Sequence, residues 1–176
     1  MYSKGLEQLR IMTGVADAHF HDDQWEAIEG LVVKRQRELV VQKTGWGKSA
    51  VYFIATKLLK AQRNGTALII SPLISLMRNQ IQAAKKLDLN VLTYNSSIEK
   101  NEKAKIEKMI TSGQADAVLI APEQLGQSYF ASQILPKISN NINLLVVDEA
   151  HCISVWGHDF RPDYQRIVRI VKNLPS

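Results

Sequence analysis

Short runs of Val, Leu and Ile recur along the chain, and amphipathic segments separate them. Five such runs, four of them almost continuous in these residues, are ELVVQ (38–42), ALIIS (67–71), VLTY (91–94), AVLIA (117–121) and NLLVVD (143–148). Runs of this kind are typical of strands covered on both faces, as in parallel sheets. Because the runs alternate with helical segments, the sequence predicts an α/β fold with a mainly parallel sheet flanked by helices.

The segments between these runs have helical periodicity. One helix is predicted over residues 72–84, where Pro72 suits the first turn. A second is predicted over 98–110, with Glu99 and Lys103 paired on its exposed face. Its inward-facing residues are predicted to be Ile106, Met109 and Ile110.

Two further helices are predicted near the ends of the chain. Asp22 or Asp23 is expected to cap the first, since short polar side chains accept hydrogen bonds from the free N–H groups there. This helix carries Trp25, Ile28 and Val32. The last helix begins near Pro162 and carries Tyr164, Ile167, Val168, Val171 and Leu174.

Composition places the chain among globular proteins, with 45% hydrophobic and 22% charged residues. A net charge of +5 is compatible with a polyanionic partner without requiring one. The single cysteine, Cys152, excludes a disulfide scaffold and a multi-cysteine zinc site. No apolar run is as long as a membrane span, and the N-terminus lacks the apolar core of a secretory signal, so we expect a cytoplasmic protein without membrane contact.

A glycine-rich segment follows the first apolar run. It reads KTGWGKSAVYF (43–53) and leads into a helix. Gly45 and Gly47 allow a tight turn whose N–H groups point at phosphate oxygens, and the helix N-terminus adds its dipole. Lys48 can reach the β- and γ-phosphates, and Ser49 can offer its hydroxyl to Mg²⁺. The alternative is an ordinary turn between a strand and a helix.

The last apolar run ends in two adjacent carboxylates, Asp148 and Glu149. Their repulsion is costly unless a cation or a water network uses them. Mg²⁺ is a natural partner for Asp148, which leaves Glu149 to polarise the water that attacks the γ-phosphate. The alternative is a pair of acids that stabilises a helix N-terminus. His151 has no second ligand at a spacing that suits zinc.

An aromatic and basic segment, CISVWGHDFRPDY (152–164), comes next. Gly157 and Pro162 favour a shaped loop over a helix. Aromatic faces beside a guanidinium suit a single-stranded nucleic acid, because bases stack on the rings and phosphate pairs with arginine. The alternative, in which Trp156 and Phe160 are buried against the core, stays open.

DEAHCISVWGHDFRPDY (148–164) resembles motif II and the following aromatic-rich loop of RecQ-type DNA helicases, which belong to superfamily 2. Four other segments resemble motifs of this family in the same order. FHDDQWEAI (20–28) resembles motif 0, QKTGWGKSAVYF (42–53) motif I, SPLISLMRNQI (71–81) motif Ia, and LIAPEQL (119–125) the segment with a Pro-Glu pair. The resemblance covers the chain from about residue 5 to its end.

The resemblance implies a RecA-like P-loop NTPase lobe, spanning residues 1–176, of an ATP-dependent DNA helicase that uses ATP and Mg²⁺. It implies that the whole protein couples hydrolysis to translocation on single-stranded DNA and to unwinding, in the 3′–5′ direction, in DNA repair or recombination. Its partners would be single-stranded and partly duplex DNA and a second RecA-like lobe of the same polypeptide. We expect the protein in the cytoplasm, associated with the nucleoid, if it is bacterial, and in the nucleus if it is eukaryotic.

The resemblance also implies roles for single residues. The catalytic residues would be Glu149 as the base, Asp148 holding metal through water, Lys48 on phosphate, and His151 coupling the nucleotide site to DNA. Ser49 and Asp148 would hold Mg²⁺. ATP would be bound by Gln24, which reads adenine, and by Thr44, Gly45, Trp46, Gly47, Lys48, Ser49 and Ala50. DNA would be bound by Ser71, Pro72, Leu73, Pro122, Glu123, Trp156, His158, Phe160 and Arg161.

Several positions depart from the family pattern. His21 stands where an arginine usually stacks on adenine, and Lys43 stands where proline is usual. Trp46 replaces a small residue, and the alternative to its predicted nucleotide contact is packing against a neighbour. Val155 replaces a glutamine. Gln42 stands where the strict phosphate-loop pattern has glycine.

Motif III and the motifs of a second lobe are absent from the sequence, so we expect a domain of a longer protein. Because an arginine finger from elsewhere contributes roughly 10³–10⁵ in rate in related reactions, we expect weak nucleotide binding, very slow hydrolysis and no unwinding from the isolated lobe. Two other readings remain: an RNA helicase, and an ATP-gated nucleic-acid-binding module with little motor activity.

Overall fold

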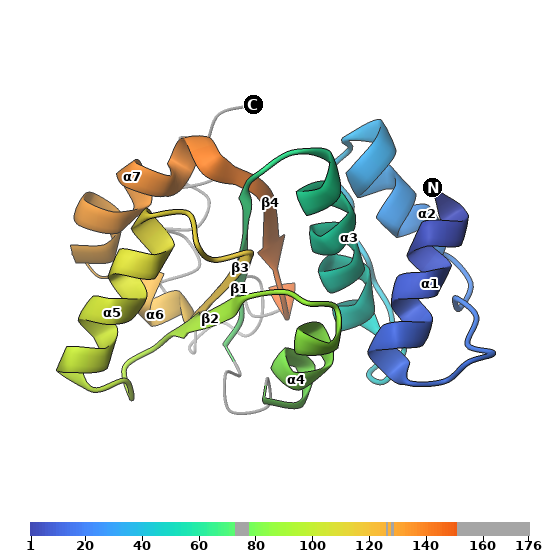
Figure 1. Ribbon diagram of the computed structural model, residues 1–176, viewed down its shortest axis with the longest axis horizontal. Helices are drawn as coiled ribbons and strands as arrows, with labels where there is room; N and C mark the ends of the chain where they lie inside the picture. Colours follow the sequence, from blue (N-terminus) through green and yellow to red (C-terminus); the bar gives the residue numbers. More distant parts are fainter. Residues whose placement is uncertain (73–77, 126, 128, 151–176) are drawn as a thin grey trace, which may run out of the picture. The chain divides into compact units, whose positions relative to one another are not determined.

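The computed structural model describes residues 1–72, 78–125, 127 and 129–150 (Figure 1). These residues belong to two compact units, which are considered one at a time. The helical unit comprises Met1–Asn64 and Arg78–Leu89, and the sheet unit comprises Gly65–Met77 and Asn90–Ser176. Among the described residues, none of the helices combines the length and the apolar character that a membrane span requires.

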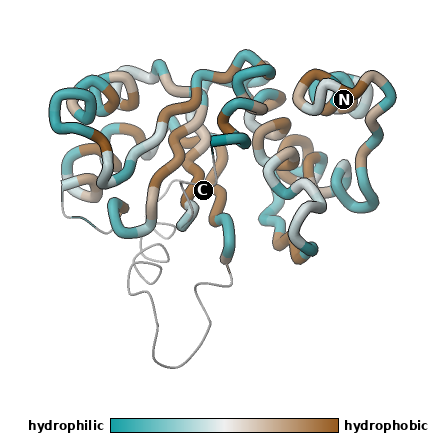
Figure 2. Tube along the Cα trace, turned by 90° about the horizontal axis from the view of Figure 1, so that it is seen from below, coloured by the Kyte–Doolittle hydropathy of each residue, from teal (hydrophilic) through white to brown (hydrophobic). Residues whose placement is uncertain are grey.

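The sheet unit is built on four parallel strands: β1 (Thr66–Ile70), β2 (Val91–Tyr94), β3 (Ala117–Ile120) and β4 (Ile142–Val147). Their order across the sheet is β2-β3-β1-β4, and every pairing is parallel. All residues of β1 and β3 are buried, which agrees with their continuous apolar runs. Figure 2 shows the strands mainly at the hydrophobic end of the colour scale. The predicted α/β class with a parallel sheet is therefore confirmed.

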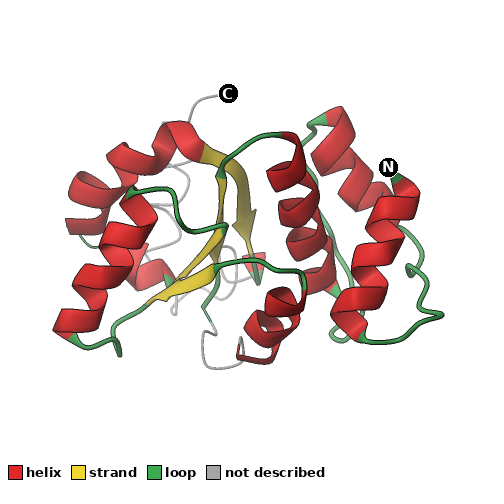
Figure 3. Cartoon of the chain, in the orientation of Figure 1, coloured by secondary structure: helices red, strands yellow, loops and turns green. Residues whose placement is uncertain are grey.

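Helices pack against one face of this sheet, as Figure 3 shows. They are α5 (Lys100–Thr111), α6 (Pro122–Leu125), the π-helical η3 (Phe130–Ile134) and α7 (Leu135–Ile138). The 3-10 turn η4 (Ser139–Asn141) follows α7 and has no buried residue. Ile110 and Phe130 pack with Leu68 and Ile120 in one core. The predicted helix over 98–110 is thus confirmed, with Ile110 fully buried.

The helical unit contains α1 (Tyr2–Thr13), α2 (Gln24–Glu29) continued by the π-helical η1 (Gly30–Lys34), α3 (Lys48–Gln62) and α4 (Arg78–Lys86). Helix α1 lies against α3 and α4, and α2 lies against α3. The Tyr52 hydroxyl donates to Gln80 Oε1 at 3.0 Å and so joins α3 to α4. The ring of Trp25 lies against Gly5 and forms an aromatic cluster with Tyr2 and Phe20.

Two local predictions are wrong. Residues 38–42 form no strand, and the side chains of Leu39 and Val41 are 82% and 80% exposed. The apolar pattern shows that a segment suits a strand, but a strand also needs a neighbour, and no described strand pairs with this one. The helix near residue 24 does exist, but its first residue follows Asp23 in the left-handed conformation, and no side chain caps it. The Gln24 N–H donates instead to the His21 carbonyl oxygen.

Helix α4 confirms the second half of the helix predicted over 72–84. Residues 73–77 of that helix and the last predicted helix, from Pro162, lie outside the described residues.

Candidate functional site

The glycine loop, residues 43–47, connects an extended segment to the first turn of α3 in the helical unit. Gly45 has φ +87° and Gly47 has φ +93°, a backbone conformation that residues other than glycine rarely adopt. A Cβ on Gly47 would also lie 2.7 Å from Gln24 Nε2, whereas a Cβ on Gly45 would have no atom within 4 Å. Both glycines are therefore required by the backbone, and only Gly47 is also required by its neighbour.

Helix α3 begins at Lys48, immediately after the loop. Gly47 is its N-cap and provides no side-chain cap, and no acidic residue lies in the first turn. The first N–H groups of the helix and its positive dipole end therefore favour an anion. Ser49, also in this turn, is half-buried. Phosphate binding at this turn stays a prediction.

The ammonium of Lys48 lies over the glycine loop. Its Nζ donates to the carbonyl oxygens of Gln42, at 3.0 Å, and Lys43, at 3.3 Å. Hydrogen bonds from a charged donor are about twice as strong as neutral ones, so they hold the side chain close to the loop. Lys48 Nζ therefore lies beside the loop to which phosphate binding is predicted.

Gln24 joins α2 to the glycine loop. Its side chain is 2% exposed, and its Nε2 donates to the Trp46 carbonyl oxygen at 2.8 Å. Its Oε1 accepts from the His21 N–H at 2.9 Å. A glutamine predicted to bind nucleotide therefore contacts the loop predicted to bind phosphate.

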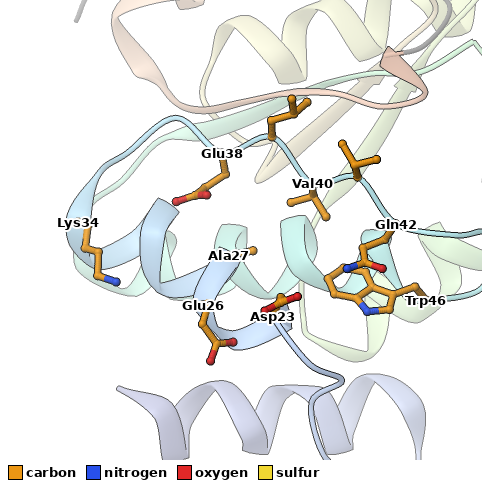
Figure 4. A pocket seen from close by; sticks show the side chains of 10 residues that line it. Asp23, Glu26, Ala27, Lys34, Glu38, Val40, Gln42 and Trp46 are labelled. Carbon is orange, nitrogen blue, oxygen red and sulfur yellow. The ribbon is translucent and has the colours of Figure 1, made fainter.

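A cavity of about 380 Å³ lies beside the glycine loop, within the size range of small-molecule sites (Figure 4). Trp46, which is 8% exposed, and Lys34 lie at opposite ends of it. Trp46 is buried, as the alternative of packing against a neighbour expects, and its predicted contact with the nucleotide stays a prediction. The cavity is lined by Asp23, Glu26, Ala27, Lys34, Glu38, Leu39, Val40, Val41, Gln42 and Trp46.

Most of these lining residues were not predicted from the sequence, because charged residues before and after a helix carry no motif. Lys34 Nζ lies 2.9 Å from Glu29 Oε2. This contact raises the pKa of Lys34 and lowers the pKa of Glu29. The pair is exposed to solvent, so its contribution to stability is small.

The acidic strand end, Asp148 and Glu149, follows β4 in the sheet unit. The Asp148 N–H donates to the Ile70 carbonyl oxygen at 2.8 Å and so extends the pairing of β4 with β1. Asp148 Oδ1 accepts from the Glu149 N–H at 3.0 Å, and Oδ2 lies 3.4 Å from the hydroxyl of Ser71, which donates to it. The carboxylate therefore has a contact on each oxygen.

Glu149 has φ +51°, a left-handed conformation that costs a glutamate roughly 1–2 kcal/mol. Such strain is often found at functional sites, where the surrounding structure holds it in place. The left-handed turn at Glu149 follows directly on the last pairing contact of β4 with β1, which Asp148 makes.

Other predicted residues also lie where parallel strands end in this unit. Ser71 follows β1, and Pro122 begins α6 one residue after β3. Ser71 and Pro122 are buried, Pro72 is half-buried and Glu123 is exposed. Ligands of open α/β sheets bind at this edge.

Beside these residues, the Lys103 ammonium lies 4.7 Å from the centre of the Tyr94 ring. Its Nζ also donates to Gln124 Oε1 at 3.4 Å.

The structure thus brings the predicted residues together in two groups. The helical unit holds Gln24, Thr44, Gly45, Trp46, Gly47, Lys48, Ser49 and Ala50. The sheet unit holds Ser71, Pro72, Pro122, Glu123, Asp148 and Glu149. The predicted residues Leu73, His151, Trp156, His158, Phe160 and Arg161 lie outside the described residues, as do Cys152 and Val155. The convergence of Lys48 and Asp148 on one nucleotide stays a prediction, as do the DNA contacts.

The sequence was compared with those of known proteins and protein families. The sequence profile of the DEAD/DEAH box helicase family matches residues 21–176. The chain is 37% identical over 155 residues to the ATP-dependent DNA helicase RecQ of Bacillus subtilis, covering 88% of the chain and 25% of that protein. It is 30% identical over 159 residues to the ATP-dependent helicase SGS1 of Saccharomyces cerevisiae, covering 89% of the chain and 11% of that protein.

The ATP-dependent DNA helicase Q5 of Rattus norvegicus is 36% identical over 140 residues, covering 77% of the chain and 14% of that protein. The chain spans about a quarter or less of the length of these curated relatives.

Proposed function

The chain belongs to the DEAD/DEAH box helicase family, and we propose that it is the ATP-binding motor lobe of a RecQ-type ATP-dependent DNA helicase. The observation that carries this proposal is the glycine loop. Two glycines with positive φ precede α3, and the ammonium of Lys48 crosses the loop that they form. The names of the relatives support DNA and ATP as the ligands of the whole protein.

Each unit has a part in this proposal. The N–H groups of the glycine loop and of the first turn of α3 bind the phosphates of ATP, and Lys48 Nζ exchanges its two carbonyl partners for phosphate oxygens. Open space around Gly45 leaves room for this approach. Gln24 holds the loop from the α2 side. To read the base in this proposal, its amide exchanges one of its two backbone partners.

The acids supply the hydrolytic chemistry. Glu149 polarises the attacking water and accepts its proton. Asp148 and the hydroxyl of Ser49 are oxygen donors, which fits them to hold Mg²⁺, directly or through water. When bound, the ion neutralises phosphate charge.

In the longer protein, we propose that hydrolysis drives translocation on single-stranded DNA in the 3′–5′ direction, with a second lobe completing the site. The isolated lobe is expected to hydrolyse ATP very slowly. Pro72 and Glu123, at the carboxyl ends of β1 and β3, are the described residues in this proposal that solvent reaches and that DNA could contact.

Nucleotide binding by this chain tests the proposal. A fluorescent ATP analogue is titrated with the unchanged chain, with Lys48→Ala and with Lys43→Ala. Lys43→Ala is the control, because the side chain of Lys43 lies in the same loop, is exposed and takes no part in the proposed contact. Losing a charged hydrogen-bond donor to phosphate weakens binding roughly tenfold to a hundredfold, while Lys43→Ala stays close to the unchanged chain. Equal binding by all three proteins would contradict the proposal.

Turnover is tested in the longer protein. Glu149→Gln is expected to abolish DNA-stimulated ATP hydrolysis while ATP binding is kept. Stimulation by RNA alone would favour an RNA helicase, and DNA binding that responds to ATP without turnover in the unchanged protein would favour a nucleic-acid-binding module.

A further inference from the structure

Ser71 lies against the carboxylate of Asp148 because of the strand register. Ile70 is the register partner of Val147, so the residues that follow them, Ser71 and Asp148, leave the sheet side by side. The Asp148 N–H donates to the Ile70 carbonyl oxygen at 2.8 Å, and the Ser71 N–H donates to Ile120 at 3.1 Å. Both backbones are therefore fixed by the sheet.

The hydroxyl of Ser71 is directed at the carboxylate. Its Oγ lies 3.4 Å from Asp148 Oδ2, while Oδ1 accepts from the Glu149 N–H at 3.0 Å. One contact on each oxygen restricts rotation of the carboxyl group about its last bond. A carboxylate oxygen can accept more than one contact, so these two hydrogen bonds are compatible with a bound cation or water.

Burial separates Ser71 from the solvent. Its side chain is 1% exposed, so its hydroxyl is not presented to a DNA strand at the surface. The DNA contact that the family resemblance implies for Ser71 stays a prediction, and the described contact points to a different role.

We propose that Ser71 is a positioning residue whose hydroxyl orients the Asp148 carboxylate for Mg²⁺ bound with a nucleotide. This inference rests on the proposed function, since it assumes that Asp148 holds the metal. Hydrogen-bond partners of metal-binding carboxylates change metal affinity by about 10–100-fold when they are removed. Because the Oγ–Oδ2 distance is long, we expect an effect of roughly tenfold, at the lower end of that range.

The chain offers a matched control in Thr66, at the other end of β1. Its hydroxyl donates to the Ala115 carbonyl oxygen at 2.7 Å and is also buried. Thr66→Val removes a buried hydrogen bond from the same strand without touching Asp148. It therefore reports what a merely structural loss in β1 does.

Mg²⁺ is titrated into the chain with a fluorescent ADP analogue, and the concentration that gives half-maximal binding enhancement is measured. Ser71→Ala and Ser71→Cys, which keeps the volume with only a weak donor, should both raise this concentration roughly tenfold. Analogue affinity in EDTA should be unchanged. Ser71→Thr, which restores a hydroxyl, should return to within about twofold of the unchanged chain, and Thr66→Val should lower the melting temperature without a shift in the Mg²⁺ requirement.

The possible failures are distinguishable. An unchanged Mg²⁺ requirement in both Ser71→Ala and Ser71→Cys overturns the positioning role, and so does an equal shift in Thr66→Val. Weaker binding of a single-stranded oligonucleotide with an unchanged Mg²⁺ requirement overturns it as well and identifies Ser71 as a DNA contact. If the unchanged chain shows no Mg²⁺-dependent binding of the analogue, the proposed function fails, and the role of Ser71 fails with it.

Discussion

Alanine at Gly47 should destabilise the chain more than alanine at Gly45, although the two glycines have almost the same backbone conformation. Their φ angles are +93° and +87°. An alanine in this region costs roughly 1–2 kcal/mol at either position. Alanine also restricts the unfolded chain, but that effect is the same for both variants. The backbone therefore predicts equal losses.

The difference comes from the neighbour. A Cβ at Gly47 would lie 2.7 Å from Gln24 Nε2, while a Cβ at Gly45 would meet open space. The Gln24 amide must move, and its 2.8 Å hydrogen bond to the Trp46 carbonyl oxygen is lost or lengthened. A net hydrogen bond contributes about 1 kcal/mol, and a buried group left without a partner costs about 1–3 kcal/mol. Gly47→Ala should therefore lose about 1–3 kcal/mol more than Gly45→Ala.

Urea unfolding followed by circular dichroism measures both losses, and repeating it with Gln24→Ala isolates the contact. Without the Gln24 amide, the two glycine variants should lose the same free energy of unfolding, within about 0.5 kcal/mol. Equal losses in the unchanged background would show that Gln24 does not oppose a Cβ at Gly47. A difference between the two glycine variants that persists beside Gln24→Ala would show that the difference has another cause.

Three substitutions and a pH dependence test other parts of the fold. The Tyr129 hydroxyl donates to Glu107, and this contact raises the pKa of the tyrosine, so Glu107→Gln should lower that pKa toward about 10 in a tyrosinate absorbance titration. The pKa of Tyr94 should stay raised, because burial is its first cause, and the stability that both neutral tyrosines contribute should fall as pH rises above about 10. Leu39→Ser should change the free energy of unfolding by less than about 0.5 kcal/mol, because that side chain is exposed. Phe130→Ala should cost about 3–5 kcal/mol, since its ring is fully buried in the core of the sheet unit.

For each of the three substitutions, one result would contradict the prediction. A Tyr129 pKa that does not move in Glu107→Gln would show that the carboxylate is not its cause. A loss above about 2 kcal/mol in Leu39→Ser would mean that residues 38–42 form the buried strand that the sequence predicts. A loss below about 1 kcal/mol in Phe130→Ala would contradict the described core.

The parts of the fold that the sequence predicted are those in which each residue's own chemistry decides. Continuous apolar runs such as 117–121 form buried strands, because a strand inside a parallel sheet is covered on both faces and every side chain enters the core. Gly45 and Gly47 adopt positive φ because glycine alone does so at no steric cost. The family profile and the parallel sheet together agree with the RecA-like fold that the motifs implied.

The parts that were missed depend on partners far away in the chain. Residues 38–42 have a strand pattern but no described neighbour. The spacing of Glu99 and Lys103 predicted a pair along the helix. The ammonium of Lys103 instead contacts Tyr94 and Gln124, which are nine and twenty-one residues away in the sequence. A hydrogen bond between residues 71 and 148 likewise follows from strand register, which a single sequence does not contain.

In the proposed function, Lys48 and Asp148 act on one nucleotide and its Mg²⁺. The most direct measurement is a crystal structure of the chain with a non-hydrolysable ATP analogue and Mg²⁺. We expect the ammonium of Lys48 on the phosphates and the Asp148 carboxylate at the same metal, directly or through water. A bound analogue whose metal and phosphates are out of reach of Asp148 would contradict the account.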